Sequence, residues 1–84
     1  APLDADRARL FVGAGRADGL RPGDLVGAIA KGAGIPGRAI GAIRLADRFA
    51  LVDLPADAID HVIEVLRGIT WNGRRVLFRR DQHG

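Results

Sequence analysis

The sequence has 84 residues, of which 48% are hydrophobic and 27% charged, so it holds enough apolar side chains for the single core of one small domain. It contains no cysteine, which excludes disulfides and thiolate metal sites. No apolar run is long enough to cross a bilayer or to act as a signal peptide, and we expect a soluble, cytoplasmic domain that does not bind membranes.

The basic residues are almost all arginine and are unevenly placed. Twelve arginines and Lys31 stand against ten acids, which gives a net charge of +3. Five arginines follow one another without an intervening acid: Arg67, Arg74, Arg75, Arg79 and Arg80. This separation of charge favours a domain with one face suited to a polyanion, although an ordinary arginine-rich surface would have the same composition.

The first predicted strand lies within residues 9–15. Leu10 and Val12 point to one face of this strand, and Arg9 and Phe11 point to the other. If Leu10 and Val12 face the core, Phe11 must be covered by a helix, a partner or a stacked base.

Three segments around the predicted elements are expected to be irregular. Residues 1–8 and 81–84 are polar and are expected to be a linker or tail and a flexible tail. The glycines after the first strand do not have the spacing of a dinucleotide-binding loop, and we expect residues 15–19 to form a mobile loop.

The first helix is expected to begin at Pro22, because proline suits the first helical position. Apolar residues then recur at helical spacing as far as Gly34, which ends the helix. Gly27 and Gly32 are unfavourable inside a helix, and we interpret such a glycine as allowing close approach to the sheet.

Five further elements are expected: a strand at residues 42–45, a turn at Asp47 and Arg48, a strand at residues 49–54, a helix from Pro55 to Gly68 and a strand at residues 75–79. Asn72 and Gly73, just before the last strand, are a strong signal for a tight hairpin. Trp71, next to this turn, is expected to cover the end of a helix.

The resulting order, strand–helix–strand–strand–helix–strand, is that of a split βαβ domain. We therefore predict an α+β fold with a four-stranded antiparallel sheet of order 4-1-3-2 and two helices on one face. The other face is left open, and Phe11 and Phe49 are expected to lie side by side on it.

Two segments resemble the signatures of the RNA recognition motif, whose open sheet stacks bases on aromatic side chains. Residues 10–13 (LFVG) resemble the shorter signature and residues 47–54 (DRFALVDL) the longer one. The longer match departs from the family pattern, because Leu51 replaces a stacking aromatic and Asp47 replaces a basic residue. The alternative is that the two phenylalanines only fill an apolar patch against the linker or tail.

A more specific resemblance lies in residues 18–29 (DGLRPGDLVGAI) and 35–43 (IPGRAIGAI). These segments resemble the C-terminal RNA-binding domain of DbpA-type bacterial DEAD-box RNA helicases, from about Arg9 to Arg79. The richness in arginine and alanine is similar to that of the Thermus helicase of this type. On this resemblance we assign residues 9–80 to an RNA-binding domain.

The resemblance implies an accessory domain that delivers the helicase core of the same chain to structured RNA. The expected target is a hairpin of large-subunit ribosomal RNA with flanking single strand, and for Thermus-like members ribonuclease P RNA is a second target class. No DNA partner is expected. The motor sequences of the helicase are absent from these residues, so this domain is expected neither to bind nor to hydrolyse ATP.

Nine side chains are candidates for contacting RNA. Phe11 and Phe49 are expected to stack on unpaired bases. The arginines expected on the open face, where they contact phosphates or stack, are Arg9, Arg44, Arg75 and Arg79. The basic residues expected to grip a hairpin beside the sheet are Arg16, Lys31 and Arg48. Arg38 and Arg67 are interpreted as solvated charges.

No catalytic, metal or cofactor site is predicted. His61 and Asp57 are one helical turn apart but supply only two of the four ligands of a structural zinc site. The sequence has no serine, and its one threonine, Thr70, has no neighbouring base. The main alternative to RNA binding is a protein-interaction module that uses exposed leucines such as Leu51 and Leu77.

Overall fold

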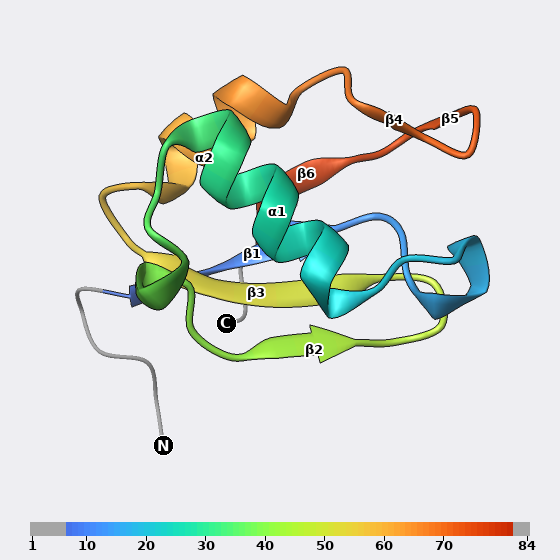
Figure 1. The fold of residues 1–84 in the computed structure, drawn as a ribbon, viewed down its shortest axis with the longest axis horizontal. Helices are drawn as coiled ribbons and strands as arrows, with labels where there is room; N and C mark the ends of the chain where they lie inside the picture. Colours follow the sequence, from blue (N-terminus) through green and yellow to red (C-terminus); the bar gives the residue numbers. More distant parts are fainter. Residues whose placement is uncertain (1–6, 82–84) are drawn as a thin grey trace.

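The structure, a computed structural model, describes residues 7–81 (Figure 1). Two helices lie on one face of a four-stranded antiparallel sheet, and a short hairpin lies beside it. The strands of the sheet, in spatial order, are β2 (Ile43–Leu45), β3 (Ala50–Pro55), β1 (Arg7–Val12) and β6 (Phe78–Arg80). The other elements are α1 (Pro22–Ala33), α2 (Ile59–Leu66), the hairpin strands β4 (Thr70–Trp71) and β5 (Arg74–Arg75), and the 3-10 turns η1 (Arg16–Asp18) and η2 (Gly37–Ala39). The predicted α+β fold and strand order are confirmed, with β6 as the fourth strand.

The core lies between the sheet and the two helices. Leu10 of β1 pairs with Val52 of β3, and both are fully buried, as are Val12 of β1 and the inward residues Ala50 and Leu54 of β3. The helices contribute Leu25, Ile29, Ile59, Val62 and Leu66 to the same core. Because side chains alternate along a strand, the intervening residues of β1 and β3 face away from the helices. The sheet therefore has one face in the core and one open face.

Helix α1 begins and ends where its sequence signals predict. Pro22 is its first residue, and the backbone N–H of Arg21 donates to the Asp24 side chain at 3.0 Å. Gly34 follows the helix with φ +70°, the left-handed conformation that glycine adopts most easily. A Cβ on Gly32 would lie 3.1 Å from the Leu66 side chain. This glycine therefore allows close approach of α2, and the interpretation that it faces the sheet is wrong.

Helix α2 starts later than predicted. Pro55 is the last residue of β3, where it pairs with Arg7, and it is followed by a turn in which Ala58 N–H donates to the Pro55 carbonyl. The helix proper begins at Ile59. Proline suits both the end of a strand and the first turn of a helix, so its presence alone does not separate the two.

The final strand is divided in two. Asn72 and Gly73 have φ angles of +52° and +78°, and this turn pairs β4 with β5 in the predicted hairpin. The chain then leaves the hairpin at Val76, which is buried, and pairs with β1 only from Phe78 onward. Arg75 is therefore part of the hairpin and does not belong to the four-stranded sheet.

The N-terminal strand and the loop after it also differ from expectation. β1 begins at Arg7, inside the segment predicted to be a linker, and residues 15–19 contain the turn η1. Residues 1–6 and 82–84, with most of the predicted linker and tail, lie outside the described residues. Neither helix in the described part of the chain is long and apolar enough to span a membrane.

Candidate nucleic-acid interface

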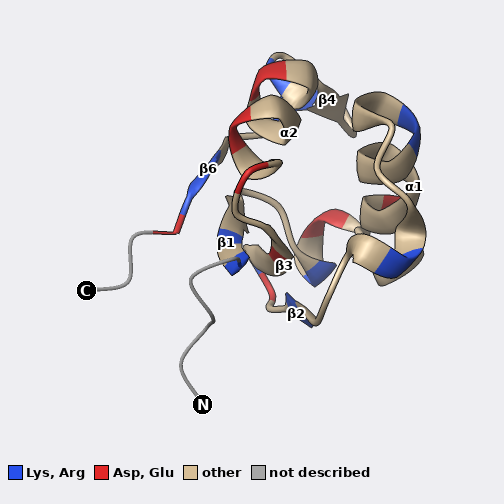
Figure 2. Cartoon of the chain, turned by 90° about the vertical axis from the view of Figure 1, so that its left-hand side faces the viewer, with Lys and Arg blue, Asp and Glu red and all other residues tan. Residues whose placement is uncertain are grey.

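The open face of the sheet carries basic and aromatic side chains from β1, β2 and β6 and from Phe49, which directly precedes β3. Phe11 of β1 pairs with Leu51 of β3 on one side and with Arg79 of β6 on the other, and Arg44 of β2 pairs with Leu51. Figure 2 shows basic residues on β1, β2 and β6, around an acidic residue of β3. This acidic residue is Asp53, the register partner of Arg9. The predicted open face is thus a layer of positive charge around an apolar centre.

At that centre, Phe11, Phe49 and Arg79 form a continuous stack, which we call the stacking platform. The rings of Phe11 and Phe49 are nearly parallel, with an interplanar angle of 12° and centroids 5.7 Å apart. The guanidinium carbon of Arg79 lies over the Phe11 ring, 4.2 Å from its centroid, a cation–π contact. Phe49 directly precedes β3 and is 39% exposed, whereas Phe11 is half-buried. The predicted neighbourhood of the two rings is confirmed.

Several arginines of this region are already paired with carboxylates. Arg9 Nε lies 3.4 Å from an Asp53 oxygen, and Arg16 lies 3.4 Å from Asp47. The Arg16 pair is largely exposed, and such pairs contribute only about 0–1 kcal/mol. A phosphate could therefore replace Asp47 as the partner of Arg16 with little loss of free energy. Arg44, Arg48 and Arg79 have no ion pair within residues 7–81.

The turn η1 brings Arg16 to the edge of the open face. Arg16 and Ala17 donate backbone N–H groups to the carbonyls of Ala46 and Asp47, both at 2.8 Å. As a result, a shallow hollow of about 430 Å³ lies between η1, β2 and β3, lined by Arg16, Arg44, Leu45, Ala46, Phe49 and Leu51. Two predicted contact arginines and the exposed ring of the stacking platform therefore share one concave surface.

Gly15 is what allows η1 to lie so close to the β2–β3 turn. A Cβ on this buried glycine would clash directly with the backbone of Ala46 and Asp47, which cannot move aside as a side chain can. We expect Gly15→Ala to lower the free energy of unfolding by about 1–3 kcal/mol, as overpacking does. Urea denaturation measures this effect. Gly23→Ala is the control, because no atom lies within 4 Å of that Cβ, and equal stability of the two variants would contradict the prediction.

Two predicted site residues do not reach the open face. Lys31 is exposed in the last turn of α1, in the helical layer that covers the opposite face of the sheet. Arg75 lies in β5 and lines a hollow against α2 with Arg67. The alternation that suggested an open-face position for Arg75 is interrupted at Val76.

One basic residue of the open face was missed by the sequence reasoning. Arg7 donates from Nη1 to the Ala39 carbonyl at 3.2 Å and from Nη2 to the Asp53 carbonyl at 3.4 Å. The alternation of residues 7, 9 and 11 contains this signal, but Arg7 falls in the predicted linker because residues 1–8 show no apolar pattern.

The hairpin is tied to η1 through Asp18. The Asp18 carbonyl accepts the indole N–H of Trp71 at 2.8 Å and also an N–H of the Asn72 side chain, and its carboxylate pairs with Arg74 at 2.7 Å. Trp71 lines a small cavity together with Asp24 and Leu25, at the start of α1. The mobile loop predicted at residues 15–19 is instead a hydrogen-bonded turn.

Within residues 7–81, no three histidine or acidic side chains gather to hold a metal ion.

Comparison with known proteins identifies the family of the chain. No curated protein matches the chain. The family model of the DbpA RNA-binding domain matches residues 9–80, which include every strand and helix of the fold except the first two residues of β1. The chain therefore belongs to the DbpA RNA-binding domain family.

Proposed function

We propose that this domain holds a DbpA-type helicase core on a hairpin of large-subunit ribosomal RNA by binding the single strand that flanks the hairpin. The observation that carries the proposal is the stacking platform, in which an exposed ring and an arginine that forms no ion pair with any described residue lie beside a basic hollow. The domain contributes binding only, and ATP hydrolysis is left to the helicase core.

The geometry suggests how an unpaired base is bound. Phe49 offers an exposed ring, whereas the Phe11 ring is already covered by Arg79. A base therefore stacks first on Phe49, and a second base displaces the Arg79 guanidinium from Phe11 or stacks on the guanidinium itself. Leu51 stands where a further aromatic would add about 1–3 kcal/mol of stacking, so phosphate contacts carry a larger share of the affinity.

The phosphate contacts come from the basic residues around the platform. Arg16 and Arg44 line the hollow beside Phe49, and Arg48 is exposed in the β2–β3 turn. Arg9 is less available, because its partner Asp53 is only 20% exposed. We assign the first three arginines to the RNA backbone where the single strand meets the hairpin stem.

Salt-dependent titration tests this function. We expect the affinity for a ribosomal hairpin with a flanking strand to fall as salt rises, with a log–log slope of about −2 if three single-strand phosphates are contacted. The same hairpin without its flank is expected to bind more weakly, and a DNA duplex of the same sequence more weakly still. A slope near zero, or equal affinity for the three ligands, would contradict the proposal. Competition with a ribonuclease P RNA fragment decides between the two target classes.

The second candidate function is protein interaction. Leu77 is 56% exposed at the edge of the sheet, and Leu51 lies on the open face, so an apolar partner has a surface to bind. Amide chemical shifts of β1 and β3 distinguish the two functions. Shifts caused by the hairpin RNA support RNA binding, and shifts caused only by the helicase core support protein interaction.

A further inference from the structure

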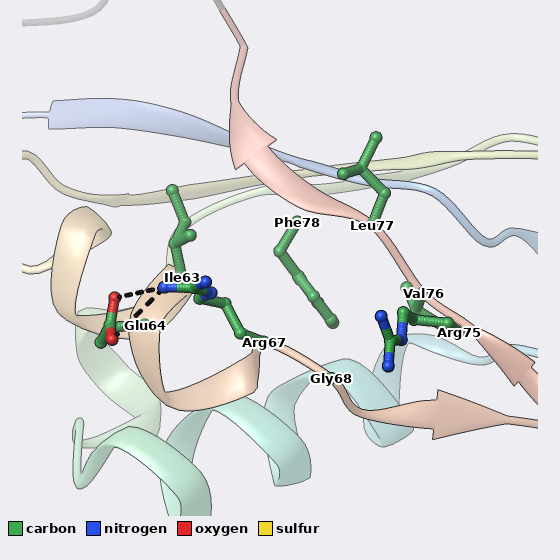
Figure 3. Close-up of a pocket in the computed structure, with 8 residues that line it drawn as sticks. All are labelled: Ile63, Glu64, Arg67, Gly68, Arg75, Val76, Leu77 and Phe78. Atoms are coloured by element: carbon green, nitrogen blue, oxygen red, sulfur yellow. Dashed lines mark hydrogen bonds and ion pairs between the residues drawn. The ribbon is translucent and has the colours of Figure 1, made fainter.

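A second hollow lies on the other side of β6, between this edge strand and the C-terminal end of α2 (Figure 3). Its volume is about 510 Å³, and the chain from β5 to β6 forms one wall. The apolar part of its lining consists of Ile63, Val76, Leu77 and Phe78. In Figure 3 the side chain of Phe78 lies between those of Arg67 and Arg75, which mark the two ends of the hollow.

The charge of this hollow favours an anion. Arg75 is exposed and has no ion pair among the residues that the structure describes. Arg67 pairs with Glu64 at 3.2 Å, but both side chains are about 70% exposed, so the pair is weak. The lining thus contains two guanidinium groups and one carboxylate.

An aromatic ring between two guanidinium groups matches the chemistry of a nucleotide. A base can stack on an aromatic side chain whatever its sequence, and its phosphate can be contacted by arginine. An acidic peptide would satisfy the arginines, but it would make no use of the ring that separates them.

The hollow is also close to the stacking platform along the chain. Leu77, with 56% of its surface exposed, directly precedes β6, and Figure 3 shows its side chain on the opposite side of the chain from that of Phe78. Arg79 belongs to the platform and Arg75 to the hollow, and with three residues between them their Cα atoms are at most about 14 Å apart. A single strand that crosses the edge of β6 at Leu77 therefore passes from one site to the other.

We infer that the hollow between α2 and β6 is a second binding site for single-stranded RNA, in which a base stacks on Phe78 and the phosphate contacts Arg75 and Arg67. The inference rests on the proposed function, because it extends the strand that the platform binds. The site would include Arg75, which the sequence places on the open face, and Arg67, which the sequence suggests is a solvated charge.

The test compares Arg75→Ala with the unchanged domain on two single-stranded RNAs, one of about four nucleotides and one of about ten. The shorter RNA fills the platform alone, and the longer one also reaches the hollow. For the longer RNA we expect Arg75→Ala to reduce affinity about fivefold and to make the salt slope shallower by about 0.7, the loss of one phosphate contact. Affinity for the shorter RNA is expected to stay within about twofold. In the unchanged domain, the amides of Gly68 and Val76 are expected to shift only with the longer RNA.

Arg38→Ala is the matched control, since Arg38 is exposed in η2, away from the hollow, and its loss removes the same charge. The inference is overturned if Arg75→Ala weakens both RNAs equally, if it acts no more strongly than Arg38→Ala, or if an acidic peptide shifts the hollow amides and RNA does not. In these cases binding of the shorter RNA to the unchanged domain still supports the proposed function. If neither RNA binds the unchanged domain, the proposed function fails and this inference fails with it.

Discussion

Replacing Phe49 with alanine is expected to weaken binding of an RNA single strand about tenfold. The ring is 39% exposed and lies against Phe11, so it is the most accessible stacking surface of the platform. Loss of one base–aromatic stack costs about 1–3 kcal/mol, and about 1.4 kcal/mol corresponds to a factor of ten. Fluorescence anisotropy with a labelled single strand measures the change.

Val65→Ala is the control for this experiment. Val65 is a similarly exposed apolar side chain, 38% accessible, but it lies on α2, in the helical layer. We expect it to leave RNA affinity within about twofold, by the general rule that surface substitutions away from a site have small effects. If Phe49→Ala binds as tightly as Val65→Ala, bases do not stack on this ring and RNA recognition lies elsewhere.

Removing Arg16 and Arg44 together is expected to reduce affinity for the flanked hairpin at least tenfold. Both arginines line the hollow beside Phe49, and neither is needed for the core. Each hydrogen bond to a charged group contributes about 1.5–3 kcal/mol when it is made, and the salt slope is expected to become shallower by about 1.4 for two lost contacts. Titration at two salt concentrations measures both quantities.

The double variant Arg21→Ala, Arg38→Ala removes the same net charge from other parts of the surface. Arg21 is exposed just before α1, and Arg38 is exposed in η2. If this control loses as much affinity as Arg16→Ala, Arg44→Ala, the RNA responds only to net charge and the hollow beside Phe49 is not a binding surface.

The fold was predictable because its main signals are local. Leu10 and Val12 show the alternation of a half-buried strand, Pro22 and Gly34 mark the ends of a helix, and Asn72 with Gly73 supplies two residues that tolerate positive φ. Each of these signals depends only on residues that are neighbours in the sequence. Their order was then sufficient to predict the sheet topology.

The parts that were missed depend on contacts between distant residues. The alternation of residues 75, 77 and 79 continues past Val76, and only the burial of Val76 and the pairing of Arg75 with Thr70 show that the strand is divided there. Nothing near Arg7 in the sequence indicates that it pairs with Pro55. Similarly, the contact between Arg79 and Phe11 depends on strand register, which alternation alone does not fix.

The hydrogen bonds of Asp18 connect two segments that lie at different edges of the proposed RNA-binding surface. Its backbone and carboxylate hold Trp71, Asn72 and Arg74, while its other carboxylate oxygen accepts the N–H of Gly15 at 3.1 Å. The backbone that carries Arg16 and the backbone that carries Arg75 are therefore mechanically coupled through one residue. Loss of the Asp18 carboxylate would therefore remove a partner from Arg74 and from the Gly15 N–H at once, so the placement of η1 and the placement of the hairpin depend on the same side chain.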